Sequence, residues 1–241
     1  TCDTAAVGGT FNSNTKAAVA GVATFSGADY TKVGTYYVKA TSGALTMACT
    51  AGTTVVSAAA AYELALSAGD GQSATVGTSV STNPAVVVRD AYANVVAGTA
   101  VGFAIASGGG SVGSASVNSN ASGISSTTWT LGTSAGTNNN TMTASNGALA
   151  GTNSITFTAS ATVGAATKLA FTAQPSATAT AGTDFAAQPG VTIQDANSNT
   201  VTSATDTVTI AMFTDSTCDT AAVGGTFNSN TKAAVAGVAT F

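Results

Sequence analysis

The feature that most constrains this chain is a perfect duplication at its two ends. Residues 1–25 read TCDTAAVGGTFNSNTKAAVAGVATF, and residues 217–241 repeat the same letters without a substitution. Thr217 corresponds to Thr1, so the repeat has a period of 216 residues. Long internal repeats are typical of proteins built as arrays of one unit. We therefore expect the chain to be a window on a tandem array, cut inside a domain.

A second, fainter repeat divides each period in two. Residues 63–90 align without a gap with residues 168–195, at an offset of 105 residues. The best-matched stretch is VVVRDAYANVV at 86–96, which lies over VTIQDANSNTV at 191–201. Each period therefore holds two related modules, which we name A and B.

The downstream halves of the two modules also correspond, though less closely. Gly34-Thr35 matches Gly136-Thr137 at an offset of 102, and Gly43-Ala44-Leu45 matches Gly147-Ala148-Leu149 at an offset of 104. The alignment predicts three parts: 1–58 as the C-terminal half of a module A, 59–163 as a complete module B, and 164–241 as the N-terminal half of the next module A.

Local patterning predicts an all-β fold. Hydrophobic residues make up 44% of the chain and charged residues only 7%, and short or β-branched side chains of this kind favour strands over helices. Apolar and polar residues alternate, Gly, Asn, Asp and Ser punctuate the turns, and no helical period appears. We expect immunoglobulin-like β-sandwiches of about seven strands each, in an extended array. The strands expected in module B are 63–68, 85–90, 100–106, 123–131, 139–145 and 153–160.

These patterns resemble bacterial immunoglobulin-like (Big) repeats of the invasin and intimin type. The motif V-x-D-A-x-x-N-x-V occupies 88–96, and Trp129-Thr130-Leu131-Gly132 and Phe157-Thr158-Ala159 match later strands of the pattern. The likeness covers essentially the whole chain. It implies a long β-sandwich stalk that works outside the cell or on its surface, as in large adhesins or extracellular fibres.

The sequence lacks the residue types that several classes of function require. The chain has no histidine, and Glu63 is its only glutamate, so catalytic triads and paired acid–base carboxylates have no candidates. We predict that it is not an enzyme and uses no cofactor. Arg89 is the only arginine and the lysines are scattered, which argues against nucleic acid and polybasic membrane binding. No apolar run approaches the roughly 20 residues of a membrane helix.

The repeated motif places an Asp and an Asn at equivalent positions in both modules: Asp90 with Asn94, and Asp195 with Asn199. One interpretation is a cation site assisted by the Asn. The other is an Asx turn, in which the carboxylate accepts hydrogen bonds from nearby backbone N–H groups. Calcium requires six to eight oxygens and usually several carboxylates. We therefore favour the turn and predict no metal site.

The cysteines favour one disulfide per period. Cys2 and Cys49 both belong to the back half of module A, and module B has none. In an exported protein an even count favours a Cys2–Cys49 disulfide, and a reduced buried pair is the alternative. Cys218 is the second copy of Cys2, so we expect it to pair with the next repeat or with a neighbouring subunit.

Three functions remain in competition. The first is a non-catalytic structural repeat unit of a surface fibre or adhesin stalk, acting as a mechanical spacer. The second is a subunit of a head-to-tail filament, in which a neighbouring molecule completes the split module A. The third is an adhesin segment that binds a glycan or a host protein through loops 107–122 or 132–140. Trp129 fits a core position better than a sugar-stacking platform. The expected partners are adjacent copies of the repeat, with a host or surface ligand at an unseen tip.

Overall fold

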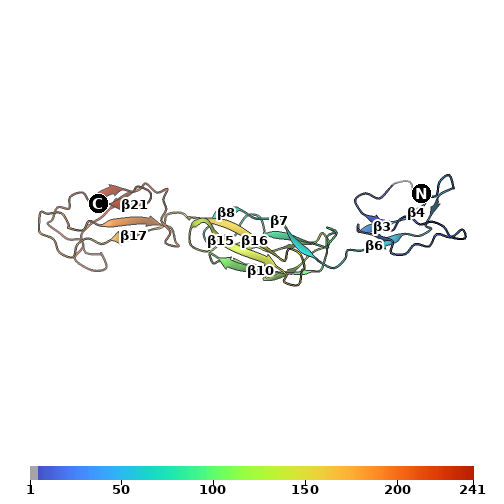
Figure 1. Ribbon diagram of the computed structural model, residues 1–241. Helices are drawn as coiled ribbons and strands as arrows, with labels where there is room; N and C mark the ends of the chain where they lie inside the picture. Colours follow the sequence, from blue (N-terminus) through green and yellow to red (C-terminus); the bar gives the residue numbers. More distant parts are fainter. Residues whose placement is uncertain (1–4) are drawn as a thin grey trace.

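The structure is a computed structural model that describes residues 5–241 and forms an elongated row of β-structure (Figure 1). Residues 5–58, the N-terminal segment, lie at one end, residues 59–163, the middle module, come next, and residues 164–241, the C-terminal segment, lie at the other end. No strand pairing of the described residues joins two of these parts. The described residues include no helix, and hence none long and apolar enough to cross a membrane. The all-β prediction is confirmed.

Two main sheets build the middle module. The five-stranded sheet has the order β12-β10-β15-β16-β8, the three-stranded sheet has the order β13-β9-β7, and β11 pairs with β14. All pairs are antiparallel except β16 with β8, which are parallel. The strands are β7 (Glu63–Ala68), β8 (Gln72–Thr75), β9 (Ala85–Arg89), β10 (Ala100–Ser107), β11 (Ser111–Val112), β12 (Ser116–Asn118), β13 (Ile124–Ser126), β14 (Trp129–Thr130), β15 (Gly136–Ser145) and β16 (Ser154–Thr162).

One hydrophobic core draws on both main sheets. The three-stranded sheet contributes Val86 and Val88 of β9, and the five-stranded sheet contributes Phe103, Met142 and Phe157. Along β10 and β15 buried side chains alternate with more exposed ones, because successive residues of a strand point to opposite faces. The alternation seen in the sequence therefore places one face of each sheet in the core.

The strands of the middle module differ from the predicted set in two ways. The predicted strand 123–131 is two strands, because β13 pairs with β9 whereas β14 pairs with β11. The break falls at Thr127, whose hydroxyl exchanges hydrogen bonds with the backbone of Ser114. Strands β8, β11 and β12 were also missed, since they are short and carry few apolar residues. The prediction of about seven strands is therefore wrong for this part of the chain, which has ten.

The C-terminal segment repeats the first half of the middle module. Its sheet has the order β17-β18-β21, and β19 pairs with β20. Leu64 lies opposite Val88, and Leu169 lies opposite Ile193, each pair shifted by the predicted offset of 105. Both pairings also carry a register shift at the same place. The strands are β17 (Lys168–Ala173), β18 (Gly190–Gln194), β19 (Thr207–Thr209), β20 (Thr231–Ala233) and β21 (Val238–Thr240).

The N-terminal segment consists of three separate two-stranded ladders, β1-β2, β3-β6 and β4-β5. Its described residues contribute to neither of the hydrophobic core clusters of the molecule. Tyr30 stacks edge-on against Phe11 and Tyr36, at ring-centroid distances of 6.3 and 4.8 Å. The strands are β1 (Phe11–Asn12), β2 (Asp29–Tyr30), β3 (Gly34–Tyr36), β4 (Lys39–Ala40), β5 (Ala48–Cys49) and β6 (Thr54–Val56).

Candidate functional site at the module joints

The loop after β9 holds a buried carboxylate. Asp90 is 1% exposed, and its Oδ1 accepts hydrogen bonds from the backbone N–H groups of Tyr92 and Asn94, both at 2.9 Å. Its Oδ2 accepts from the backbone N–H of Ala59 at 2.9 Å and from the side-chain amide of Asn94 at 3.0 Å. All of these partners are N–H donors, which is the geometry of an Asx turn.

Asn94 extends this turn into the preceding part of the chain. Its side-chain N–H donates to the carbonyl of Thr31 at 2.8 Å, and its side-chain oxygen accepts from the N–H of Val33 at 3.1 Å. Thr31 and Val33 belong to the N-terminal segment, in the loop just before β3. One amide side chain therefore bonds the middle module to the segment that precedes it, and we name this contact the first joint.

A second joint of the same construction lies at the next boundary. Asp195 is also buried, and its carboxylate accepts from the N–H groups of Asn197 and Asn199 at 2.9 Å each and from Gly164 at 3.0 Å. The side chain of Asn199 donates to the carbonyl of Thr133 at 2.9 Å and accepts from the N–H of Ala135 at 2.9 Å. Thr133 and Ala135 lie in the middle module, just before β15.

The equivalences between the two joints follow the sequence repeats. Thr31 and Val33 correspond to Thr133 and Ala135 at the offset of 102 that relates the following Gly-Thr pairs. Ala59 corresponds to Gly164 at the offset of 105. These partner residues lie outside the Asp-Asn motif and were not predicted. The sequence does carry a signal for these partner loops. Each loop is followed by a Gly-Thr pair, and the two pairs match each other in the weaker repeat of the downstream halves.

Hydrogen bonding keeps the two joint carboxylates charged. Burial acts to raise the pKa of Asp90, but the hydrogen bonds from Asn94, Ala59 and Tyr92 outweigh it and hold the pKa below its ordinary value. Asp195 behaves in the same way, with Gly164 and Asn199 as its strongest donors opposing the effect of burial on its pKa. Donors aimed at a carboxylate favour its ionised form. Each joint therefore contains a stabilised anion.

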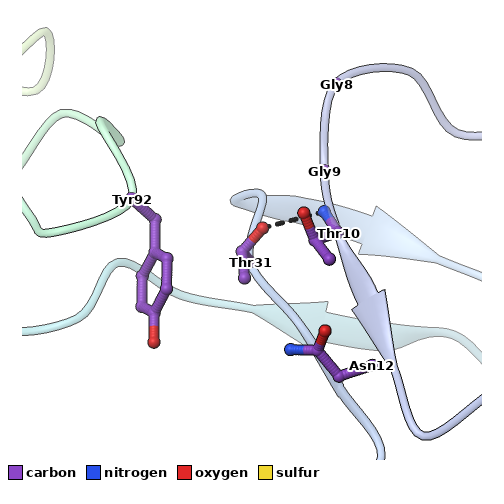
Figure 2. Close-up of a pocket in the computed structure, with 6 residues that line it drawn as sticks. All are labelled: Gly8, Gly9, Thr10, Asn12, Thr31 and Tyr92. Atoms are coloured by element: carbon purple, nitrogen blue, oxygen red, sulfur yellow. Dashed lines mark hydrogen bonds between the residues drawn. The ribbon is translucent and has the colours of Figure 1, made fainter.

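A shallow cleft lies beside the first joint. It is lined by Gly8, Gly9, Thr10, Asn12, Thr31 and Tyr92. Figure 2 shows Tyr92, from the Asp90–Asn94 loop, across the cleft from Thr10 and Thr31, which share a hydrogen bond of 2.9 Å. The second joint has Asn197 at the position of Tyr92, so the aromatic side chain belongs to the first joint alone.

The other residues that the sequence singled out lie apart from the joints. Trp129 is fully buried in the core of the middle module, where its indole N–H has no hydrogen-bond partner in the described part of the chain. Cys49 lies on β5, and Cys218 is a free, exposed cysteine. Cys2 lies outside the described residues, so the Cys2–Cys49 pairing stays a prediction.

The described residues form no group of three or more His, Cys, Asp or Glu side chains that could hold a metal ion. Comparisons with protein-family models, with curated proteins and with solved structures found no match. The resemblance to bacterial immunoglobulin-like repeats therefore stays a prediction.

Proposed function

We propose that this chain is a structural repeat unit of a long extracellular or cell-surface fibre or adhesin stalk, in which immunoglobulin-like modules serve as non-catalytic mechanical spacers. The observation that carries the proposal is the duplicated joint. Two successive boundaries use the same Asp and Asn, the same acceptor loop and the same hydrogen bonds. Because the same contacts recur at both boundaries, each module is held against its neighbour in the same geometry. A regular stalk requires such a repeated geometry.

The strand order supports the immunoglobulin-like part of the proposal. In such sandwiches strands A, B and E share one sheet and strands C, F and G share the other. In the middle module β7, β9 and β13 share one sheet, and β10, β15 and β16 share the other. The single Trp of the chain lies in the core between them. The disulfide between Cys2 and Cys49 belongs to the same proposal, and peptide mapping without reduction tests it.

Small-angle X-ray scattering of the intact chain tests the joints. Each Asn side chain makes two hydrogen bonds across its boundary, which together contribute about 1–3 kcal/mol. We expect the double variant Asn94→Ala, Asn199→Ala to lose the extended, rigid scattering profile and to be cut faster by proteases near residues 57–62 and 163–167.

The matched control is Asn120→Ala. Asn120 forms a similar turn with Ser122 and Ile124, but wholly inside the middle module. We expect this variant to scatter like the unmodified chain. If the double joint variant kept the extended profile, or if Asn120→Ala lost it equally, the joints would not be what holds neighbouring modules in line.

A further inference from the structure

Two neighbouring strand edges of the middle module carry no charge. Residues 91–167 contain no Asp, Glu, Lys or Arg, and within this range β12 and β13 are the outermost strands of their sheets. The hydroxyl of Ser125 on β13 donates to the carbonyl of Val117 on β12 at 2.9 Å, so the two edges lie together. Exposed edges tend to pair with other chains, and proteins commonly protect them with charged side chains. These edges therefore need another kind of protection.

The loop that joins β12 to β13 contains an acceptor sequence for a glycan. Asn120-Ala121-Ser122 fits the pattern Asn-x-Ser/Thr, in which x is not Pro. All three residues are exposed. A glycan on Asn is bulky and strongly hydrated. Attached to Asn120, it would stand beside both uncharged edges.

The same pattern occurs once more in the chain, at Asn139-Asn140-Thr141 on β15. Asn140 is fully buried. The side-chain N–H of Asn139 donates to the carbonyl of Ser134 at 2.7 Å, and the hydroxyl of Thr141 shares a hydrogen bond of 2.7 Å with that of Ser107. The groups that a transferase would need are therefore occupied here, which leaves Asn120 as the accessible site.

The side chain of Asn120 is held with its amide nitrogen free. Its Oδ1 accepts hydrogen bonds from the backbone N–H groups of Ser122 at 2.9 Å and Ile124 at 3.0 Å, whereas its Nδ2 donates to no residue of the described chain. An amide nitrogen becomes a nucleophile when it loses a proton, and the resulting negative charge is shared with the oxygen. Two N–H donors already aimed at that oxygen stabilise this charge.

Module A shows that the chain can turn at this place without an Asn. Gly237-Val238 corresponds to Gly123-Ile124, and Ala234 stands where module B has Asn120. There a backbone bridge between Val235 and Val238 closes the hairpin. The Asn is therefore not required for the chain reversal, and each period of 216 residues carries one accessible acceptor sequence.

We propose that Asn120 is the acceptor of an N-linked glycan, which keeps the edges of β12 and β13 from pairing with other chains. The donor is a sugar activated as a glycosyl diphosphate. Nδ2 of Asn120 forms a bond to the anomeric carbon of the sugar, and the bond between that carbon and the diphosphate oxygen breaks. The diphosphate leaves with the electron pair, and the amide proton passes to a base of the transferase.

The inference rests on the proposed function only for the extracellular or cell-surface setting, in which such glycans are common. It does not depend on the joints. Glycan attachment and the stiffness of the chain are measured separately, so either idea can fail while the other stands.

Transfer of sugar to the purified, folded chain tests the inference. The chain is incubated with a soluble N-glycosyltransferase and UDP-glucose, and separately with an oligosaccharyltransferase and a polyprenyl-diphosphate oligosaccharide. Peptide mapping by mass spectrometry should find sugar on Asn120 and none on Asn139. The mass that is added, one hexose or the whole oligosaccharide, identifies the donor. No sugar on Asn120 with either donor, or equal occupancy of Asn139, would overturn the inference.

Variants of Ser122 separate the acceptor sequence from the turn. Ser122→Ala removes the hydroxyl but keeps the backbone N–H that bonds Asn120, so it should lose the glycan completely, whereas Ser122→Thr should keep it. Trp129 fluorescence in urea should show the same unfolding midpoint for both. Thr141→Val destroys the second acceptor sequence and should be glycosylated as the unmodified chain is. A glycan that persisted in Ser122→Ala would contradict recognition through this sequence.

Light scattering tests the role of the glycan. The glycosylated chain should stay monomeric at concentrations at which Ser122→Ala, treated with the same enzyme and donor, aggregates. If the two preparations aggregated equally, the glycan would not be what protects the edges of β12 and β13.

Discussion

At the scale of single residues, the joints depend on a buried carboxylate that remains ionised. A charge removed from water is costly unless hydrogen bonds replace its hydration. Asp90 and Asp195 obtain these bonds from the turn that follows and from the linker that precedes each module. In each joint the Asp holds its own loop, the Asn side chain and the linker that precedes the module. The Asn side chain then makes the hydrogen bonds to the preceding segment or module.

We predict that acid loosens both joints. The folded-state pKa of Asp90 and Asp195 is lowered, so their contribution to stability is fully present above the unfolded value of about 3.9. It is lost as the pH falls from there through the lowered folded-state pKa. Scattering profiles should agree at about pH 7 and about pH 5, and they should show an increasingly flexible chain as the pH falls below about 3.9. In the double variant Asp90→Asn, Asp195→Asn the joints should be loose at every pH. If the scattering profile of that variant changed with acid as much as that of the unmodified chain, groups other than these two carboxylates would be responsible.

Trp129 gives a second prediction at this scale. Its side chain is fully buried, and large-to-small substitutions of buried aromatic residues cost about 3–5 kcal/mol. Trp129→Ala should lower the free energy of unfolding of the middle module by that amount, measured by urea denaturation with circular dichroism. Tyr92→Ala, at an exposed position, is the control and should change it by less than about 0.5 kcal/mol.

At the scale of elements, the repeat fixes strand register and turn geometry. β7-β9 and β17-β18 have the same register, and β13 and β21 meet the middle strand of their sheets in the same way. The offset of 105 was readable from the sequence because both modules bury the same side chains. The boundaries of β13 and β14 were not readable, since a change of pairing partner leaves no local pattern in the side chains.

Gly123 offers a test of this turn geometry. Its φ is +73°, and a Cβ there would lie 2.9 Å from the carbonyl oxygen of Val88. An L-residue pays roughly 1–2 kcal/mol in this left-handed region, and the close contact adds to it. Gly123→Ala should lower the free energy of unfolding by at least that amount, followed by Trp129 fluorescence in urea. Gly147→Ala, where a Cβ would meet nothing within 4 Å, should cost much less, and equal costs would contradict the argument.

At the scale of the whole molecule, the two copies of the duplicated segment adopt different structures. Both form the same turn: Val19 bridges Val22 as Val235 bridges Val238. Only the C-terminal copy forms β20 and β21, because only there do β19 and β18 offer edges to pair with. Pairing partners supplied by the rest of the chain therefore decide whether this segment forms strands.

A matched pair of substitutions tests this dependence on context. Ala239 lies on β21 opposite Val191 of β18 and is fully buried, whereas Ala23, the same position in the other copy, is exposed. Ala239→Asp should speed hydrogen exchange of the β18 amides at least about tenfold, since a charge enters the core. Ala23→Asp should leave exchange throughout a dilute sample unchanged. Similar effects of both substitutions would mean that the two copies share one environment.

The sequence by itself determined the all-β class, the two repeat offsets, the shared strand register and the turns at Asp90 and Asp195. These depend on local patterning and on side chains that bond to their own loop. Only the tertiary structure decided which copy of the duplicated segment is buried, and that Asn94 binds the loop at Thr31. Both kinds of contact join residues far apart in the chain, so no local pattern records them. The burial of the C-terminal copy depends on apolar groups leaving water together, and the contact of Asn94 depends on donors and acceptors that meet only in the folded chain.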